Sequence, residues 1–175
     1  MANIEELLKA RIRSVPDYPK KGILFRDVTP LFKDAEAFGT CIAEIAKRFS
    51  KDNVQYVAGI EARGFIVGGA VAEALHAGFV PIRKKGKLPY KKISVEYDLE
   101  YGKETMEIHE DAVEKGSRVL IIDDLLATGG TANASAELLR KLGAEIVGFV
   151  FIVELTDLNG KQKLNGSRME SLVKY

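Results

Sequence analysis

Two adjacent acids, followed by a loop of small residues, are the feature of this sequence that most clearly points to chemistry. Asp123 and Asp124 end an apolar run that begins at Val119, and residues 127–131 then read Ala-Thr-Gly-Gly-Thr. Such a loop lets backbone N–H groups approach an anion closely, and a helix that begins near Thr131 would add the positive end of its dipole. The pattern predicts a phosphate site, although a polar turn before a helix is the simpler alternative.

The two carboxylates narrow the choice of ligand. Adjacent acids would repel a phosphate unless a cation, or a neutral group with hydroxyl donors, lay between them. A ribose ring meets this requirement, because its hydroxyls can donate to the acids while its 5-phosphate reaches the loop. The GxxxxGK[ST] and GxGxxG motifs of other phosphate-binding loops are absent from the sequence. We therefore expect a ribose 5-phosphate site.

An alternation of strands and helices is expected to position these residues. Apolar, β-branched stretches predict strands, and stretches with apolar residues every three or four positions predict helices. The expected strands are 54–60, 79–84, 118–124 and 145–155. The expected helices run from Ile4 to about Val15 and over 34–50, 65–78 and 131–144, and Asp34 is the expected N-cap of the helix 34–50. Such alternation is typical of a parallel sheet covered on both faces, where ligands bind beyond the carboxyl ends of the strands.

Residues 83–110 interrupt this alternation. The stretch alternates in twos around glycine and carries a cluster of lysines, which predicts an antiparallel hairpin or flap. A solvated surface excursion is one interpretation. A lid over a site for an anionic ligand is the other, since loops on a rigid scaffold often carry function.

Composition limits the remaining possibilities. The chain has 175 residues, 46% of them hydrophobic, which fits a single domain over 1–175. Lys plus Arg number 26 against 25 Asp plus Glu, so neither nucleic acid nor a membrane is expected as a partner. Cys41 is the only cysteine, which favours a reducing compartment and a buried apolar role for that side chain. The N-terminal stretch lacks the apolar core of a signal peptide, so a cytoplasmic location is expected.

At this point the motifs resemble a known family. The stretch "VLIIDDLLATGGTA" resembles the phosphoribosyl-pyrophosphate motif of the type I phosphoribosyltransferases, in the wording of the branch that acts on adenine. Five more stretches resemble that branch in the same order: "SVPDYPKKGILFRDVTPLF", "GIEARGF", "IRKKGKLP", "YDLEYGKETMEIH" and "FIVELTDLNGKQKL". The resemblance implies an α/β fold, with a central mainly parallel sheet flanked by helices and a small antiparallel hood or flap. Residues 83–110 would be that hood and flexible loop.

The resemblance also implies roles for the residues of the phosphate site. Asp123 and Asp124 would bind the ribose hydroxyls. The 5-phosphate would lie in the loop formed by Ala127, Thr128, Gly129, Gly130 and Thr131. Arg63 of "GIEARGF" would hold the pyrophosphate and assist catalysis, a role that suits the multidentate arginine side chain.

Basic residues and a flexible loop are implied around the pyrophosphate. Arg83 and Lys87, and with less support Lys84 and Lys85, resemble residues that reach it from the hood or the neighbouring subunit; a solvated lysine run is the alternative. The stretch "YDLEYG" resembles the loop that closes over the substrates and carries the catalytic residues Glu100 and Tyr101.

The stretch "GILFRD" resembles the segment that receives the base. Phe25 would stack on adenine, and the backbone of Leu24 and Arg26 would read its edge, whereas without the resemblance Phe25 would be assigned to the core. The implied reaction converts adenine and 5-phosphoribosyl 1-pyrophosphate (PRPP) to AMP and pyrophosphate, in a homodimer. It uses Mg²⁺ held mainly by substrate and water, since the sequence offers no cluster of metal ligands.

Two alternatives remain open. A sibling enzyme would act on hypoxanthine, guanine or xanthine, but a 6-oxo purine asks for a donor such as lysine, and "FVFIVELTD" contains none. A PRPP-sensing regulator that binds nucleic acid would need an additional module or a broad basic face, and the net charge is only +1.

Overall fold

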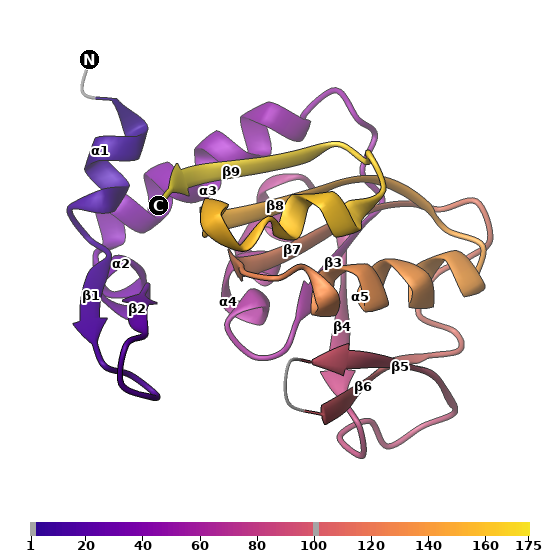
Figure 1. The fold of residues 1–175 in the computed structure, drawn as a ribbon. Helices are drawn as coiled ribbons and strands as arrows, with labels where there is room; N and C mark the ends of the chain where they lie inside the picture. The colour runs from indigo at the N-terminus through magenta and orange to yellow at the C-terminus, as the bar shows by residue number, and fades with distance from the viewer. Residues whose placement is uncertain (1–2, 100–101) are drawn as a thin grey trace.

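A seven-stranded sheet forms the centre of the computed structural model, which describes residues 3–99 and 102–175 (Figure 1). The strand order is β5-β6-β4-β3-β7-β8-β9, with β4, β3, β7, β8 and β9 parallel and β6 and β5 antiparallel at one edge. The bounds are β3 Tyr56–Ile60, β4 Gly78–Lys84, β5 Lys92–Leu99, β6 Gly102–His109, β7 Arg118–Leu126, β8 Glu145–Glu154 and β9 Met169–Lys174. The predicted parallel sheet and antiparallel hairpin are therefore confirmed.

Helices cover both faces of this sheet. They are α1 Ile4–Lys9, α2 Thr29–Lys33, α3 Ala35–Phe49, α4 Gly64–Ala74 and α5 Gly130–Lys141, with short 3-10 helices η1 Thr156–Leu158 and η2 Gly160–Leu164. Alternate residues of β7 point to opposite faces, as a pleated strand requires. Leu120 and Ile122 pack in the core beneath α3 and α4, whereas Val119 and Ile121 pack in the core beneath α5. No helix in the described residues is long and apolar enough to cross a membrane.

The helix α3 forms where the sequence predicts it. The Asp34 carboxylate accepts a hydrogen bond of 3.0 Å from the backbone N–H of Ala37, which satisfies one of the free donors at the helix N-terminus. Ala37, Cys41, Ile45 and Phe49 recur every four residues and are all buried. Cys41 is thus the small buried hydrophobe that the sequence analysis expected.

The Cys41 thiol is expected to be inert in the native protein. Burial raises the pKa of Cys41 to about 12, and the reactive thiolate is therefore scarce at neutral pH. A chromogenic disulfide reagent should react roughly a thousandfold more slowly in buffer than in concentrated denaturant, because reaction must await opening of the core. Fast labelling of the folded protein would contradict this burial.

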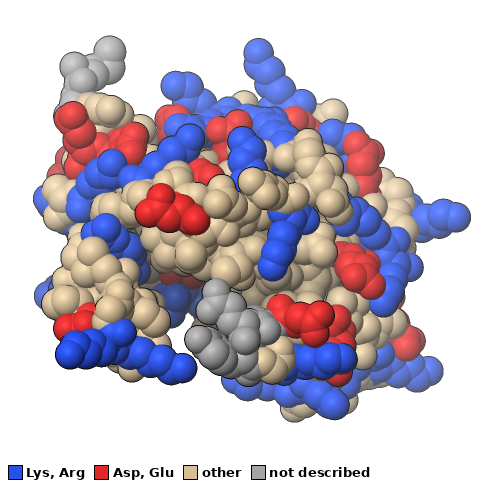
Figure 2. Space-filling model, viewed as in Figure 1, with Lys and Arg blue, Asp and Glu red and all other residues tan. Residues whose placement is uncertain are grey.

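Charged residues of both signs are mixed on the surface. On the face drawn in Figure 2, lysine and arginine side chains alternate with aspartate and glutamate side chains. Over the described residues of this face, no broad area of one sign is visible.

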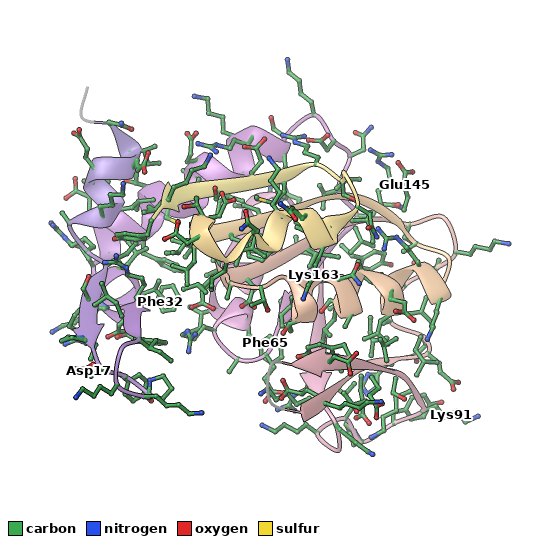
Figure 3. All side chains as sticks on the ribbon, viewed as in Figure 1. Asp17, Phe32, Phe65, Lys91, Glu145 and Lys163 are labelled. Atoms are coloured by element: carbon green, nitrogen blue, oxygen red, sulfur yellow. The ribbon has the colours of Figure 1, made fainter. Side chains whose placement is uncertain are left out.

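The N-terminal helix is shorter than the apolar repeat predicted. It ends at Lys9, and Arg13–Pro16 forms strand β1, which pairs antiparallel with β2, Leu24–Asp27. The two strands make a separate sheet beside α1 and α2, with Asp17 near its tip (Figures 1 and 3). The expected helix to Val15 was wrong because residues 13–16 pair with the strand Leu24–Asp27, and helical periodicity carries no signal of such pairing.

Candidate active site

The paired acids lie inside the last part of β7, which continues two residues past them to Leu126. Asp124 is only 4% exposed, and its Oδ2 accepts a 2.6 Å hydrogen bond from Nε of Arg63. Gly64 lets the β3–α4 turn approach, since a Cβ there would lie 2.9 Å from Oδ1 of Asp123. Burial, followed by the charge of Asp124, raises the pKa of Asp123 well above its usual range. The pair therefore resists carrying two full negative charges and favours neutral hydroxyl donors as partners.

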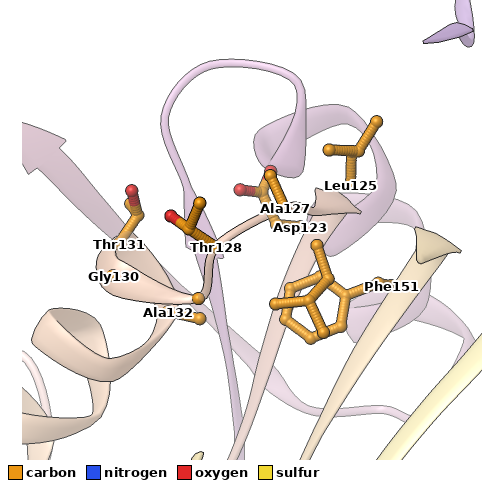
Figure 4. Close-up of a pocket in the computed structure, with 10 residues that line it drawn as sticks. Asp123, Leu125, Ala127, Thr128, Gly130, Thr131, Ala132 and Phe151 are labelled. Atoms are coloured by element: carbon orange, nitrogen blue, oxygen red, sulfur yellow. The ribbon is translucent and has the colours of Figure 1, made fainter. Parts of the chain in front are cut away.

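The small-residue loop connects β7 to α5 and surrounds a cavity of about 90 Å³ (Figure 4). The helix begins at Gly130, and Gly129 before it has φ +79°, a left-handed conformation that glycine adopts without strain. The loop residues Ala127, Thr128, Gly129, Gly130 and Thr131 all line this phosphate-loop pocket, together with Asp123, Leu125, Leu126, Ala132 and Phe151. The structure thus brings together the five residues that the sequence analysis grouped.

Helix η2 supports this loop from behind. A Cβ on Gly129 would collide with the carbonyl oxygen of Gly160, and a Cβ on Gly160 would collide with that of Ala127. The two segments are more than 30 residues apart in the sequence, and they touch only because both glycines lack side chains. Gly160 was missed by the sequence analysis, since nothing local marks it as part of the phosphate loop.

A second, central pocket of about 410 Å³ adjoins the first. It is lined by Glu61, Ala62, Arg63, Lys84, Lys87, Asp123 and Asp124, so Asp123 belongs to both pockets. Glu61, which the sequence analysis also missed, organises its basic residues. The Glu61 carboxylate accepts from Nζ of Lys87 at 2.8 Å and from both Nε and Nη2 of Arg83 at 3.2 Å. Arg83 therefore lies behind Glu61, while Lys84 and Lys87 line the pocket itself.

The charge of Glu61 is held by these contacts. Burial alone would raise the pKa of Glu61, but hydrogen bonds from Arg83, Lys87 and the backbone of Lys84 outweigh it and lower the pKa to about 2. The carboxylate is thus ionised at neutral pH. It holds Arg83 and Lys87 close together, two cations that would otherwise repel each other.

Stability is expected to depend on Glu61 at low pH. A carboxyl whose pKa falls from 4.5 to about 2 on folding stabilises the protein above pH 4.5 and loses this contribution as the pH falls toward 2. Glu61→Gln should therefore remove about 3 kcal/mol of the fall in unfolding free energy across this range. Urea unfolding at several pH values measures it, and Glu137→Gln, from an exposed pair with Lys141, is the control. Identical curves for wild type and Glu61→Gln would contradict the assignment.

A third pocket, of about 360 Å³, lies on the other side of Arg63. It is lined by Val15, Tyr18, Phe25, Asp27, Thr29 and Arg63. The Phe25 ring meets Tyr18 edge to face at 5.2 Å, and the Arg63 guanidinium lies 5.8 Å from its centre. This Phe25 pocket presents an aromatic wall with a polar carboxylate at Asp27, which suits a flat heterocycle.

The neighbours of Phe25 are arranged differently. The side chain of Leu24 is 47% exposed, and the guanidinium of Arg26 stacks 3.7 Å from the ring centre of Tyr175 and donates to Oγ of Ser14 at 2.5 Å. Neither side chain lines the Phe25 pocket among the described residues. This is compatible with the expectation that only their backbone meets a ligand, which stays a prediction.

Glu100 and Tyr101 fall outside the described residues, so their catalytic roles stay predictions. Lys91 directly precedes β5, at the end of the hairpin opposite its turn, and lies away from Phe65 (Figure 3). Within residues 3–99 and 102–175, no cluster of three histidine, cysteine, aspartate or glutamate side chains is arranged to hold a metal ion.

Known proteins resemble this chain along nearly its whole length. The model of the phosphoribosyl transferase domain matches residues 32–168. The adenine phosphoribosyltransferase of Acetivibrio thermocellus is 55% identical over 96% of this chain and 99% of that protein. The crystal structure of adenine phosphoribosyltransferase from Thermoanaerobacter pseudethanolicus matches with a TM-score of 0.95 and 50% identity, covering 98% of this chain and 99% of that one. The Saccharomyces cerevisiae enzyme, crystallised with adenine and an imino-altritol bisphosphate, matches at 0.92 and 38%, covering 98% and 99%.

Proposed function

This chain belongs to the phosphoribosyltransferase family, and we infer that it converts adenine and PRPP to AMP and pyrophosphate, a reaction of purine salvage. The type I fold, with its mixed seven-stranded sheet, is the one that the sequence resemblance implied. Relatives of high coverage carry this activity in their names, and the yeast neighbour was crystallised with adenine.

The observation that carries this assignment is the row of three joined pockets. Asp123 is shared by the phosphate-loop pocket and the central pocket, and Arg63 is shared by the central pocket and the Phe25 pocket. The reactants need this order, because the ribose carries the 5-phosphate on one side and receives the base on the other. We assign the 5-phosphate to the loop, the ribose and pyrophosphate to the central pocket, and adenine to the Phe25 pocket.

In this arrangement the protein stabilises charge rather than forming a covalent bond. N9 of adenine bonds to the anomeric carbon as the carbon–oxygen bond to pyrophosphate breaks, so positive charge grows on the ribose and negative charge on the leaving group. Arg63, Lys84 and Lys87 would meet that negative charge in the central pocket. Asp123 and Asp124 would hold the ribose hydroxyls. We keep Glu100 as the proposed acceptor of the proton from adenine, and Tyr101 as its neighbour in the closing loop.

Mg²⁺ is proposed as the cofactor, bound mainly by pyrophosphate and water. The carboxylates of Asp123 and Asp124 line the central pocket and are hard oxygen ligands of the kind that Mg²⁺ prefers, although Asp124 is already bonded to Arg63. These residues would hold the ion through its waters. When bound, it would neutralise charge on the leaving pyrophosphate.

A homodimer and a cytoplasmic location are also proposed. Ile66 on α4 is 49% exposed and Phe79 on β4 is 37% exposed, and Phe79 contacts the ring of Phe65 at 5.8 Å. This apolar area supports a second copy of the chain as its partner. Sedimentation of the wild type and of Ile66→Asp tests the dimer, and a single sedimenting monomer in both would exclude it.

Residues 83–110 remain, by proposal, the hood and flexible loop of a single domain.

The activity is tested by offering adenine, hypoxanthine, guanine and orotate separately with PRPP and Mg²⁺. We expect AMP and pyrophosphate from adenine alone, and no turnover when the metal is chelated. Nucleotide from a 6-oxo purine would mean that the assignment of adenine to the Phe25 pocket is wrong. Binding of PRPP with no product from any base would instead favour the PRPP-sensing regulator. On the described residues of the face in Figure 2, no broad basic area is visible for the nucleic acid that such a regulator would bind.

A further inference from the structure

A chain of four polar side chains connects the phosphate-loop pocket to the central pocket. Tyr97 on β5 faces Glu104 on β6 across the hairpin, and its hydroxyl donates to Oε2 of Glu104 at 2.9 Å. The same hydroxyl lies 2.9 Å from Oγ1 of Thr131. Lys84 Nζ lies 2.5 Å from the other oxygen of Glu104. Thr131 lines the first pocket and Lys84 lines the second, so the two anion sites are linked through the hairpin.

Counting protons fixes the direction of these bonds. Burial raises the pKa of Tyr97 to about 12, so its hydroxyl keeps its proton at neutral pH. Desolvation opposes the charge of Glu104, but the contacts with Lys84 and Tyr97 lower its pKa, and the carboxylate can only accept. Tyr97 therefore gives its one proton to Glu104, and its oxygen accepts the proton of Thr131.

An anion in the loop disturbs this order. A phosphate would accept a hydrogen bond from the Thr131 hydroxyl, whose proton would then point toward the phosphate. The oxygens of Thr131 and Tyr97, 2.9 Å apart, would be left with no proton between them. The contact survives only if Tyr97 turns its proton toward Thr131 and gives up Glu104. The ring itself stays in place, since it packs on the loop: a Cβ on Gly130 would lie 3.2 Å from Cδ2 of Tyr97.

We propose that Tyr97 is a positioning residue of the phosphate loop, whose hydroxyl turns from Glu104 to Thr131 when the 5-phosphate binds. This proposal rests on the proposed function, which places the 5-phosphate against Thr131. Binding then breaks a side-chain hydrogen bond between β5 and β6. Filling of the loop is thereby transmitted to the hairpin and to Glu104, which keeps Lys84 as its partner.

The test is a double-mutant cycle on the dissociation constant of ribose 5-phosphate, measured by titration calorimetry. Glu104→Ala removes the competing acceptor before the ligand arrives, so we expect binding about fivefold tighter than wild type. In a Tyr97→Phe background, the gain in affinity from Glu104→Ala should be at least threefold smaller than in the wild-type background. Lys84 loses its partner in both backgrounds, so its effect on binding cancels in this comparison. Tightening is a useful sign, since general damage to the hairpin would only weaken binding.

A matched control comes from the hydroxyl–carboxylate pair of Tyr56, the first residue of β3, and Glu114, joined at 2.6 Å; neither residue lines the three pockets. Tyr56→Phe and Glu114→Ala should change the dissociation constant by less than twofold. An unchanged or weaker affinity of Glu104→Ala, or a gain that differs less than threefold between the two backgrounds, would overturn the role of Tyr97. A wild-type protein that neither binds ribose 5-phosphate nor makes AMP would overturn the proposed function as well.

Discussion

Arg63→Ala is expected to lower kcat/KM for PRPP by about a thousandfold, the largest effect of any single substitution considered. Arg63 is the side chain that lines both the central pocket and the Phe25 pocket, and it bonds Asp124 at 2.6 Å. Its removal takes a cation from the leaving pyrophosphate and leaves the carboxylate of Asp124, 4% exposed, without this partner. Steady-state kinetics with adenine and PRPP varied in turn give the value.

Two further variants separate charge from geometry. Arg63→Lys keeps the charge but loses the planar fork, so an intermediate loss of about thirtyfold is expected. Arg140→Ala, at the exposed C-terminal end of α5, removes an arginine away from the pockets and should leave the kinetics unchanged. If Arg63→Ala and Arg140→Ala behaved alike, the pyrophosphate would have to be placed elsewhere.

Gly160→Ala is expected to lower kcat/KM for PRPP by about a hundredfold, although Gly160 lies far from the phosphate loop in the sequence. The added methyl would collide with the carbonyl oxygen of Ala127 and lie 3.0 Å from the backbone nitrogen of Gly129. Both contacts are with backbone, so the loop itself must shift, and a displacement of about 1 Å near a reacting group can cost a hundredfold in rate. The loss should appear mainly as a raised KM for PRPP.

Adenine binding provides the internal comparison for this variant. The Phe25 pocket does not include the loop, so the dissociation constant of adenine should change less than twofold. Gly39→Ala is the matched control, because a Cβ on that exposed residue of α3 meets nothing within 4 Å. It should leave the kinetics intact and raise the unfolding free energy by about 1 kcal/mol. Wild-type kinetics for Gly160→Ala would mean that contact with Gly160 does not hold the loop in its active position.

Apart from β9, the sequence alone predicted the strands of the sheet, the helices α3, α4 and α5, and the small-residue loop that is proposed to bind phosphate. These depend on local signals: periods of two and of 3.6, a capping acid at Asp34, and small residues between Asp124 and α5. The error at residues 10–15 has the same origin, since an apolar repeat is compatible with a helix until a partner strand, here Leu24–Asp27, competes for it.

Tertiary structure alone decided which distant residues complete the site. Glu61 follows β3 in the sequence, but only the folding of Arg83 and Lys87 against it makes it the carboxylate that holds both cations. Gly160 and Tyr97 reach the phosphate loop from η2 and β5, at separations where the sequence carries no periodic signal. Motifs record what the backbone must do locally, whereas contacts between segments depend on how the sheet brings their ends together. The sequence thus determined the chemistry of the loop, and the packing of the folded chain determined what holds the loop in place.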